Sequence, residues 1–273
     1  MFEILEKRVL GPEIKLFKIK APAIAQKAHP GQFVIFRIRE EGERVPLTIN
    51  DFDRDAGTIS IAFQEVGKST LLLGRLNEGD AILDLVGPLG RPTEIENFGR
   101  VVCIGGGVGT AVIYPVTRAL YQAGNHVIGI LGARSKDLLI LEQEMASVTH
   151  RLLISTDDGS KGHKGLVTEV LKQVIEEGEK IDRVIAIGPT IMMKFVAKTT
   201  EPYGIKTIVS LNPIMIDGTG MCGVCRVNVG KDTKFACVHG PEFDGHAVDF
   251  DLLMSRLTEY KAEEHEALET MGK

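Results

Sequence analysis

The sequence has no long apolar run, and neither sign of charge dominates it. Its hydrophobic stretches are shorter than the roughly 18 residues of a membrane-spanning helix, so we expect no membrane partner. Lys and Arg number 32 against 37 Asp and Glu, and the net charge of -5 excludes the basic surface typical of nucleic-acid binding. Charged residues also interrupt the first eight positions, MFEILEKR, which predicts no secretory signal and a cytoplasmic location.

Cysteine is scarce, with four residues in 273, and three of the four are crowded into one corner of the sequence. This distribution is not the disulfide framework of a secreted protein and favours a metal site. A phosphate-binding P-loop is also missing. The segment VGKST, at 66–70, lacks the glycine that the motif requires five residues before Gly67, because position 62 is Ala62.

The pattern of apolar residues changes twice along the chain. Up to residue 98, short runs alternate apolar and polar positions, as in the strands of a small antiparallel barrel. Over 99–210, continuous apolar runs alternate with helical patterns, which predicts a parallel sheet with helices on both faces. The region 211–273 loses this rhythm, holds the cysteine corner and ends in a charged helical segment at 249–269. The predicted fold class is a multidomain β plus α/β protein.

The cysteine corner reads DGTGMCGVC and continues to FACVHGPEF. Its spacing, D-x4-C-x2-C-x11-C, is that of a plant-type [2Fe–2S] site in which a carboxylate replaces the first thiol. The glycines of the loop let its backbone curl and turn N–H groups toward the sulfurs. We predict that an iron–sulfur cluster is bound by four side chains, those of Asp217, Cys222, Cys225 and Cys237.

Two alternatives remain open at this corner. An Asp-Gly pair is common in turns, where the carboxylate accepts hydrogen bonds from nearby amides, so Asp217 has a structural interpretation as well as that of a ligand. His239 follows Cys237 by two residues, and a Cys3His zinc site is the alternative metal centre. The corresponding function is that of a zinc-stabilised nucleotide-binding protein without redox chemistry.

A glycine-rich turn, GGGVGTA at 105–111, follows an apolar strand and opens a helix. Glycine at such a turn lets a pyrophosphate approach the positive end of the helix. The turn departs from G-x-G-x-x-G at Thr110, and the next strand ends near Arg134, where a standard unit places an acid. Two later strands end at Asp157 and at Gly188-Pro189, at the edge where such sheets bind ligands. The residues predict a pyridine-nucleotide site and leave NAD and NADP open.

The motifs RVPLT, VGKST, VGPLGRP, GGGVGT, STDDGSKGHKG, IGPTIMMK and DGTGMCGVC…FACVHGPEF follow one another over nearly the whole chain. In this order they resemble the ferredoxin–NADP reductase-like electron-transfer subunits. That family includes the electron-transfer subunit of dihydroorotate dehydrogenase and the small subunit of NADH-dependent ferredoxin:NADP oxidoreductase, also called sulfide dehydrogenase-like. Dihydroorotate dehydrogenase subunits carry cysteine at the position of Asp217, so this chain is more similar to the second branch.

The resemblance implies which residues hold each cofactor. FAD would be held by the barrel residues Arg44, Val45, Pro46, Leu47, Thr48, Ala62, Phe63, Gln64, Gly67, Ser69 and Thr70, the last two at its pyrophosphate. NAD(H) would be held by Gly107, Val108, Gly109, Thr110, Asp157, Gly188, Pro189 and Met192. No catalytic side chain is expected, because hydride transfer is the chemistry of the cofactors themselves.

The implied function is that of an oxidoreductase subunit passing electrons between NAD(H), FAD and a [2Fe–2S] cluster. The three regions would be an FAD-binding barrel at 1–98, an NAD(H)-binding domain at 99–210 and a cluster region at 211–273. The whole enzyme would be an electron-bifurcating NADH-dependent ferredoxin:NADP oxidoreductase. Its larger glutamate-synthase-like subunit, the expected partner in a heterodimer, would carry FAD and [4Fe–4S] clusters and react with NADPH and ferredoxin. The alternative, the electron-transfer subunit of NAD-dependent dihydroorotate dehydrogenase, shares these cofactors and differs in its partner.

Overall fold

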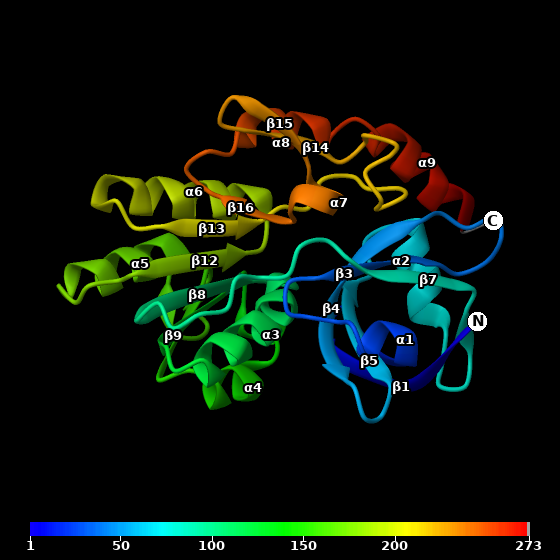
Figure 1. Ribbon diagram of the computed structural model, residues 1–273, viewed down its shortest axis with the longest axis horizontal. Coiled ribbons are helices and arrows are strands. Elements are labelled where there is room, and N and C mark those ends of the chain that lie inside the picture. Colours follow the sequence, from blue (N-terminus) through cyan, green and yellow to red (C-terminus); the bar gives the residue numbers. More distant parts are fainter. Residues whose placement is uncertain (272–273) are drawn as a thin grey trace.

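A computed structural model describes residues 1–271. An antiparallel barrel from the N-terminal part lies on one side and an α/β layer on the other (Figure 1). The C-terminal segments run from the α/β layer toward the barrel. Within the described residues, no helix combines the length and the hydropathy needed to cross a membrane.

The barrel is built from short antiparallel strands. They are β1 (Phe2–Gly11), β2 (Ile14–Lys20), β3 (Phe33–Arg37), β4 (Val45–Asp53), β5 (Thr58–Gln64), β6 (Ala81–Ile82) and β7 (Asp84–Leu89), with helices α1 (Pro22–Ala25) and α2 (Lys68–Arg75) in the connections. Their order in the sheet is β6-β1-β2-β5-β4-β3-β7. Because β6 and β7 are consecutive in the chain yet end the two edges of the sheet, the sheet must curl on itself.

Side chains alternate along the strands between the surface and the interior of the barrel, and the inward-facing ones fill the interior. Phe17 of β2 and Phe63 of β5 are fully buried and meet edge to face, with ring centroids 5.1 Å apart. Burial of one such ring contributes about 2–3 kcal/mol. The sequence patterns of β2 and β5 therefore predict strands correctly. β1 was not predicted, because Ile4 is its only buried side chain and the other residues are half-buried or exposed without regular alternation.

The second sheet is parallel except at one edge. Its order is β11-β10-β9-β8-β12-β13-β16, from strands β8 (Arg100–Gly106), β9 (His126–Ala133), β10 (Arg151–Thr156), β11 (His163–Lys164), β12 (Arg183–Ile187), β13 (Thr207–Ser210) and β16 (Glu242–Asp244). The connections contain α3 (Gly109–Gln122), η1 (Lys136–Leu138), α4 (Glu142–Ser147), α5 (Val167–Glu176), α6 (Thr190–Thr200) and η2 (Glu201–Tyr203).

Helices cover both faces of this sheet, as the continuous apolar strands predict. Residues of α3 and α4 pack with one face and residues of α5 and α6 with the other. Cys103 of β8 lies in the α3 face, and burial raises the pKa of its thiol to about 12, so it is an inert core residue. The strand order reverses direction between β8 and β12, which creates the switch point where such sheets bind ligands.

The C-terminal region contains β14 (Arg226–Val229), β15 (Asp232–Phe235), α7 (Ala236–His239), α8 (Phe250–Arg256) and α9 (Lys261–Met271). Strand β16 from this region pairs antiparallel with β13 and so completes the second sheet. The helical segment expected at 249–269 is divided into α8 and α9. The division follows burial, because α8 packs Phe250 and Leu253 into the core and α9 has no buried residue. The region predicted at 211–273 extends two residues past the described part of the chain.

Candidate cofactor sites

A cavity of about 420 Å³ opens at the switch point of the second sheet. From the predicted NAD(H) set, its wall includes Gly107, Val108, Asp157, Pro189 and Met192. Gln64, predicted for the flavin, lines the same cavity from the end of β5. One pocket therefore brings a residue of the barrel together with residues that follow β8, β10 and β12.

The glycine-rich turn is shaped by close backbone contacts. Gly107 has a φ of +55° and donates its N–H to the carbonyl of Gly132 at 2.9 Å. Nothing lies within 4 Å of the position where a side chain on Gly107 would begin, so this backbone borders open space. A side chain on Gly109 would instead collide with the carbonyl oxygen of Ile187. The turn thus has one glycine for the ligand side and one for helix–strand packing.

Three predicted nucleotide residues lie behind the cavity wall instead of in it. Gly109 packs against the end of β12, and Thr110 is only 3 % exposed at the start of α3. A side chain on Gly188 would meet the methyl group of Met192 at 2.7 Å, so this glycine makes room for a residue of the wall. These three positions shape the pocket from behind.

Arg134, which the sequence placed at the end of a strand, lies in the wall. Sequence patterns did not identify several other residues of the wall, including Ile14, Leu138, Leu166, Ile191 and Phe195. Ile191 and Phe195 stand four positions apart on α6, and each is 47 % exposed. Their exposure is visible only in the structure, because apolar residues occupy most positions of α6 and no separate stripe distinguishes these two in the sequence. Ile14 likewise reaches the cavity only through the packing of the barrel on the sheet.

The predicted flavin residues of the barrel occupy two neighbouring strands. Val45, Pro46, Leu47 and Thr48 begin β4 and are half-buried, and Arg44 just before them is exposed. On β5 the structure places the side chain of Phe63 in the barrel core and that of Ala62 in a small cluster with Ala111 of α3. Of the three β5 residues, only Gln64 reaches the pocket.

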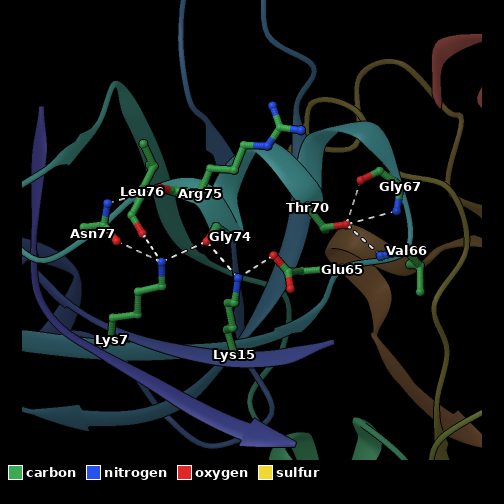
Figure 2. Close-up of polar contacts among 10 residues, drawn as sticks. All are labelled: Lys7, Lys15, Glu65, Val66, Gly67, Thr70, Gly74, Arg75, Leu76 and Asn77. Atoms are coloured by element: carbon green, nitrogen blue, oxygen red, sulfur yellow. Dashed lines mark hydrogen bonds and ion pairs between the residues drawn. The ribbon is translucent and has the colours of Figure 1, made fainter. Parts of the chain in front are cut away.

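The start of α2 is organised by its own hydroxyl groups, as Figure 2 shows for Thr70. Thr70 Oγ1 accepts hydrogen bonds from the N–H groups of Val66 and Gly67, at 3.2 and 3.1 Å. The Ser69 hydroxyl donates to the carboxylate of Glu43. Thr70 therefore fixes the shape of the turn, and the first-turn N–H groups of α2, which lack partners within the helix, are the donors suited to a pyrophosphate.

The carboxylate of Asp217 forms a turn within the cysteine corner. Its Oδ1 accepts the N–H of Thr219 and its Oδ2 accepts that of Cys222, each at 2.9 Å. These hydrogen bonds, that of Thr219 first, hold the pKa of Asp217 below its usual value. The turn-forming interpretation of Asp217 is thus realised in the structure. A carboxylate has about four lone-pair positions, so the group keeps capacity for a metal.

Two of the thiols meet inside the protein. Cys225 and Cys237 are buried, with their sulfur atoms 3.2 Å apart, and Cys222 is exposed. Burial first, and then the neighbouring Cys225, raise the pKa of the Cys237 thiol to about 12. At neutral pH this thiol keeps its proton, and a bound metal would displace it.

The donor set fits a two-iron cluster. Each iron of a [2Fe–2S] centre takes two protein ligands. The sulfur atoms of Cys225 and Cys237 lie side by side as one pair, and the Asp217 carboxylate, hydrogen-bonded to the backbone N–H of Cys222, would form the second pair with the Cys222 thiol. Across residues 1–271 no three His, Cys, Asp or Glu side chains converge on a single ion position. His239, the alternative zinc ligand, accepts the N–H of Phe235 on its Nδ1 at 2.9 Å and serves the turn.

Comparison with known proteins places both sites in described domains. Residues 103–198 match the family described as "Oxidoreductase NAD-binding domain". Residues 212–249, which include all four predicted cluster ligands, match "Iron-sulfur cluster binding domain of dihydroorotate dehydrogenase B". The fold and these two domains define an electron-transfer subunit of an oxidoreductase.

Similar proteins extend the match to nearly the whole chain. A dihydroorotate dehydrogenase B (NAD(+)) electron transfer subunit homolog of Thermotoga maritima is 49 % identical, over 96 % of this chain and 92 % of its own. The dihydroorotate dehydrogenase B electron transfer subunit of Desulforamulus reducens is 32 % identical over 88 % of this chain and 94 % of its own. This chain belongs to the family of dihydroorotate dehydrogenase B electron transfer subunits and their homologues.

A solved structure is similar over its full length. It comes from work described as "Insights into flavin-based electron bifurcation via the NADH-dependent reduced ferredoxin-NADP oxidoreductase structure". The two folds superpose with a TM-score of 0.95 and 46 % identity, covering 100 % of this chain and 98 % of the other. The matches confirm the predicted fold class, the resemblance and the oxidoreductase class, and they support the cofactor set of FAD, NAD(H) and an iron–sulfur cluster.

Proposed function

We propose that the chain is the small, NAD(H)-reacting subunit of an electron-bifurcating NADH-dependent ferredoxin:NADP oxidoreductase. The observation that carries the proposal is the joint lining of one pocket by Gln64 of the barrel and by the switch-point residues of the sheet. A nicotinamide bound there would lie beside the strand predicted to hold the flavin. The full-length similarity to the bifurcating oxidoreductase structure supports the same assignment.

The pocket residues perform binding and orientation. The open backbone at Gly107 and the start of α3 suit a pyrophosphate, and the apolar side chains of Met192, Ile191 and Phe195 exclude water from the neighbouring wall. Asp157, at the end of β10, provides an acceptor suited to ribose hydroxyls. The bound FAD and cluster would supply the conversion between two-electron hydride transfer and single-electron transfer.

The cluster corner has an inner and an outer half. Cys225 and Cys237 are buried, whereas Cys222 is exposed and the adjacent Met221 is 88 % exposed. Electrons would thus reach the surface at this loop, which suits transfer to another protein. We infer a larger flavin and [4Fe–4S] subunit of the glutamate-synthase-like class as the partner, with ferredoxin reacting on that subunit. We infer a cytoplasmic location, since the four cysteines of the described residues form no disulfide and three of them are the predicted cluster ligands.

An anaerobic optical and EPR titration with NADH tests the proposal. We expect about one FAD and two irons per chain, with flavin and cluster signals that both change on adding NADH. NADPH is added to a parallel sample, since the predicted preference is for NADH. A colourless protein that carries zinc in place of iron and flavin would overturn the proposal.

The second candidate is the electron-transfer subunit of NAD-dependent dihydroorotate dehydrogenase, which the names of the relatives favour. The two candidates share cofactors and differ in the partner subunit. Co-purification from the native cell distinguishes them: an orotate-forming partner supports the second candidate, and an iron–sulfur flavoprotein that reacts with NADPH and ferredoxin supports the first.

A further inference from the structure

Two lysine side chains converge on the C-terminal end of α2, as Figure 2 shows. The Lys7 ammonium group, from β1, donates to the carbonyls of Gly74 and Leu76 at 2.9 and 2.6 Å. The Lys15 ammonium group, from β2, donates to the same Gly74 carbonyl at 2.9 Å. Positive charge at this end of a helix complements the partial negative charge of its unpaired carbonyls.

Lys15 also forms an ion pair with Glu65, with Nζ and Oε1 2.6 Å apart. The two side chains are only 20 % and 15 % exposed. Such a pair is held much more firmly than a surface pair, because loss of one partner leaves the other withdrawn from water without compensation.

Glycine at position 74 is a requirement of this ion pair. A side chain on Gly74 would overlap the carboxylate of Glu65 and would approach Lys15 Nζ at 3.0 Å. Gly74 is the second-to-last residue of α2, and glycine destabilises a helix by up to about 1 kcal/mol relative to alanine. The helix thus keeps an unfavourable residue at the one position where it meets the Lys15–Glu65 pair.

The Lys15–Glu65 pair lies between the nucleotide pocket and the first turn of α2. Glu65 directly follows Gln64, which lines the nucleotide pocket, and directly precedes the turn that Thr70 closes through Val66 and Gly67. The same segment therefore runs from the pocket, past the ion pair, to the first turn of α2. Lys15 holds the segment at Glu65 and the helix at Gly74, so it controls both ends of the element predicted to contact the flavin pyrophosphate.

We propose that Lys15, acting through Glu65 and the Gly74 carbonyl, is a positioning residue for the pyrophosphate of FAD. The inference rests on the proposed function, because it assumes that FAD binds at the start of α2. Without the Lys15 ammonium group, the Glu65 carboxylate would lie beside the Gly74 carbonyl without its cation, and that carbonyl would keep only the hydrogen bond from Lys7. Repulsion between the carboxylate and the carbonyl would displace the turn at 66–70 and with it the first-turn N–H groups.

The test uses the full chain stripped of flavin and titrated separately with FAD and with riboflavin, which has no phosphate. For Lys15→Met we expect the Kd for FAD to rise at least about tenfold, because the unpaired carboxylate shifts the turn. The Kd for riboflavin should change less than about twofold, since the barrel strands at β4 and β5 stay in place.

A control variant and a rescue variant complete the test. Lys20→Met makes the same substitution at an exposed position of β2 and should leave both affinities unchanged. In the double variant Lys15→Met/Glu65→Gln, the new amide can donate to the Gly74 carbonyl, and we expect FAD affinity to recover by at least about threefold over Lys15→Met alone.

The outcomes separate the two proposals. If the unsubstituted chain binds no FAD, the proposed function fails, and this inference fails with it. If that chain binds FAD and Lys15→Met binds it equally well, only the positioning role is overturned. Equal loss of FAD and riboflavin in Lys15→Met would also overturn it, because that result indicates general damage to the barrel. Selective loss of FAD with recovery in the double variant supports it.

Discussion

The cluster corner and the nucleotide pocket are built in opposite ways. All four predicted cluster ligands lie between Asp217 and Cys237, a stretch that runs from the Asp217 turn through the β14–β15 hairpin to α7. The pocket instead draws on residues from Ile14 to Phe195, which only the order of the strands brings together. A site encoded by spacing can be recognised in a sequence of any fold, whereas a site encoded by topology is visible only once the fold is known.

The two sites also differ in what a single substitution would remove. In the cluster corner one side chain supplies one ligand, so its loss should affect the metal and little else. In the pocket most of the wall is backbone or apolar side chain, and substitutions should act through shape.

Removing an inner ligand should abolish the cluster. For Cys237→Ser we expect iron content and the cluster EPR signal to fall below about a tenth of the unsubstituted values, because a hydroxyl binds iron far more weakly than a thiolate does. FAD content should stay unchanged, since the flavin residues belong to the barrel.

Cys103→Ser is the matched control for this experiment. The same substitution is made at a cysteine buried in the α3 face of the sheet, away from the cluster corner. The control should keep its iron. Iron retained in Cys237→Ser, or lost equally in both variants, would contradict the assignment of Cys237 as a ligand.

A side chain on the glycine-rich turn should block the nucleotide without unfolding the domain. Alanine at Gly107 would place its methyl group in the open space of the pocket at a φ of +55°, which costs about 1–2 kcal/mol of stability. We expect NADH affinity to fall at least about tenfold, because the pyrophosphate could no longer approach the backbone.

Gly178→Ala is the control, because Gly178 also has a positive φ, of +83°, and open space around it, outside the wall of the pocket. Thermal unfolding and NADH titration should show a similar loss of stability in both variants but weakened binding only in Gly107→Ala. Equal NADH affinities in the two variants would place the pyrophosphate elsewhere.

The features that the sequence predicts are the ones that neighbouring residues determine. Strand and helix alternation after residue 99 depends on local chemistry, and the α/β sheet that it predicts is found in the structure. The D-x4-C-x2-C-x11-C spacing is equally local, and its ligand set stays a prediction. Strand β1 was missed because it buries only Ile4 fully, and β16 because it forms only by pairing with a distant strand. Ile14 and Phe195 were missed for the same reason, since each reaches the pocket through tertiary packing.

The family resemblance identified candidate flavin residues that the sequence pattern alone could not. The structure shows which of their side chains line the pocket and which lie in the barrel core. Gln64 lies in the pocket, whereas Phe63 beside it points into the barrel core because side chains alternate along β5. A contact made by Phe63 would therefore involve its backbone. Asp217 remains a predicted ligand, because its hydrogen bonds to the turn are compatible with either role.

Substitution of the carboxylate separates these two roles of Asp217. In Asp217→Cys a thiolate would replace an oxygen ligand and donate more electron density to iron, so we expect the midpoint potential of the cluster to shift downward and its EPR signal to change. Redox titration followed by EPR measures both. A carboxylate that only caps Thr219 and Cys222 would give an unchanged potential and spectrum in this variant, and the [2Fe–2S] site would then need another fourth ligand.

The smallest effect is expected at the seam between the barrel and the second sheet, where Thr93 contacts Glu242. Glu242 of β16 accepts a hydrogen bond from the Thr93 hydroxyl at 2.6 Å, and desolvation raises the pKa of its carboxyl to about 7. The folded protein thus retains a proton that the unfolded chain releases near pH 4.5. This contribution to stability is fully present below about pH 4.5 and is lost as the pH rises through about 7. Its size is at most about 3 kcal/mol.

Glu242→Gln removes the titration and should flatten this part of the pH dependence. Between pH 5 and pH 8 we expect the melting temperature of the unsubstituted protein to fall about 5 °C further than that of the variant. Asp244→Asn, an exposed position on the same strand, should behave like the unsubstituted protein. If Glu242→Gln and the unsubstituted protein lose stability in parallel, the carboxyl of Glu242 must be as well hydrated as one on the surface. The seam that joins the barrel to the sheet would then be more open to water than the packing of Thr93 against β16 indicates.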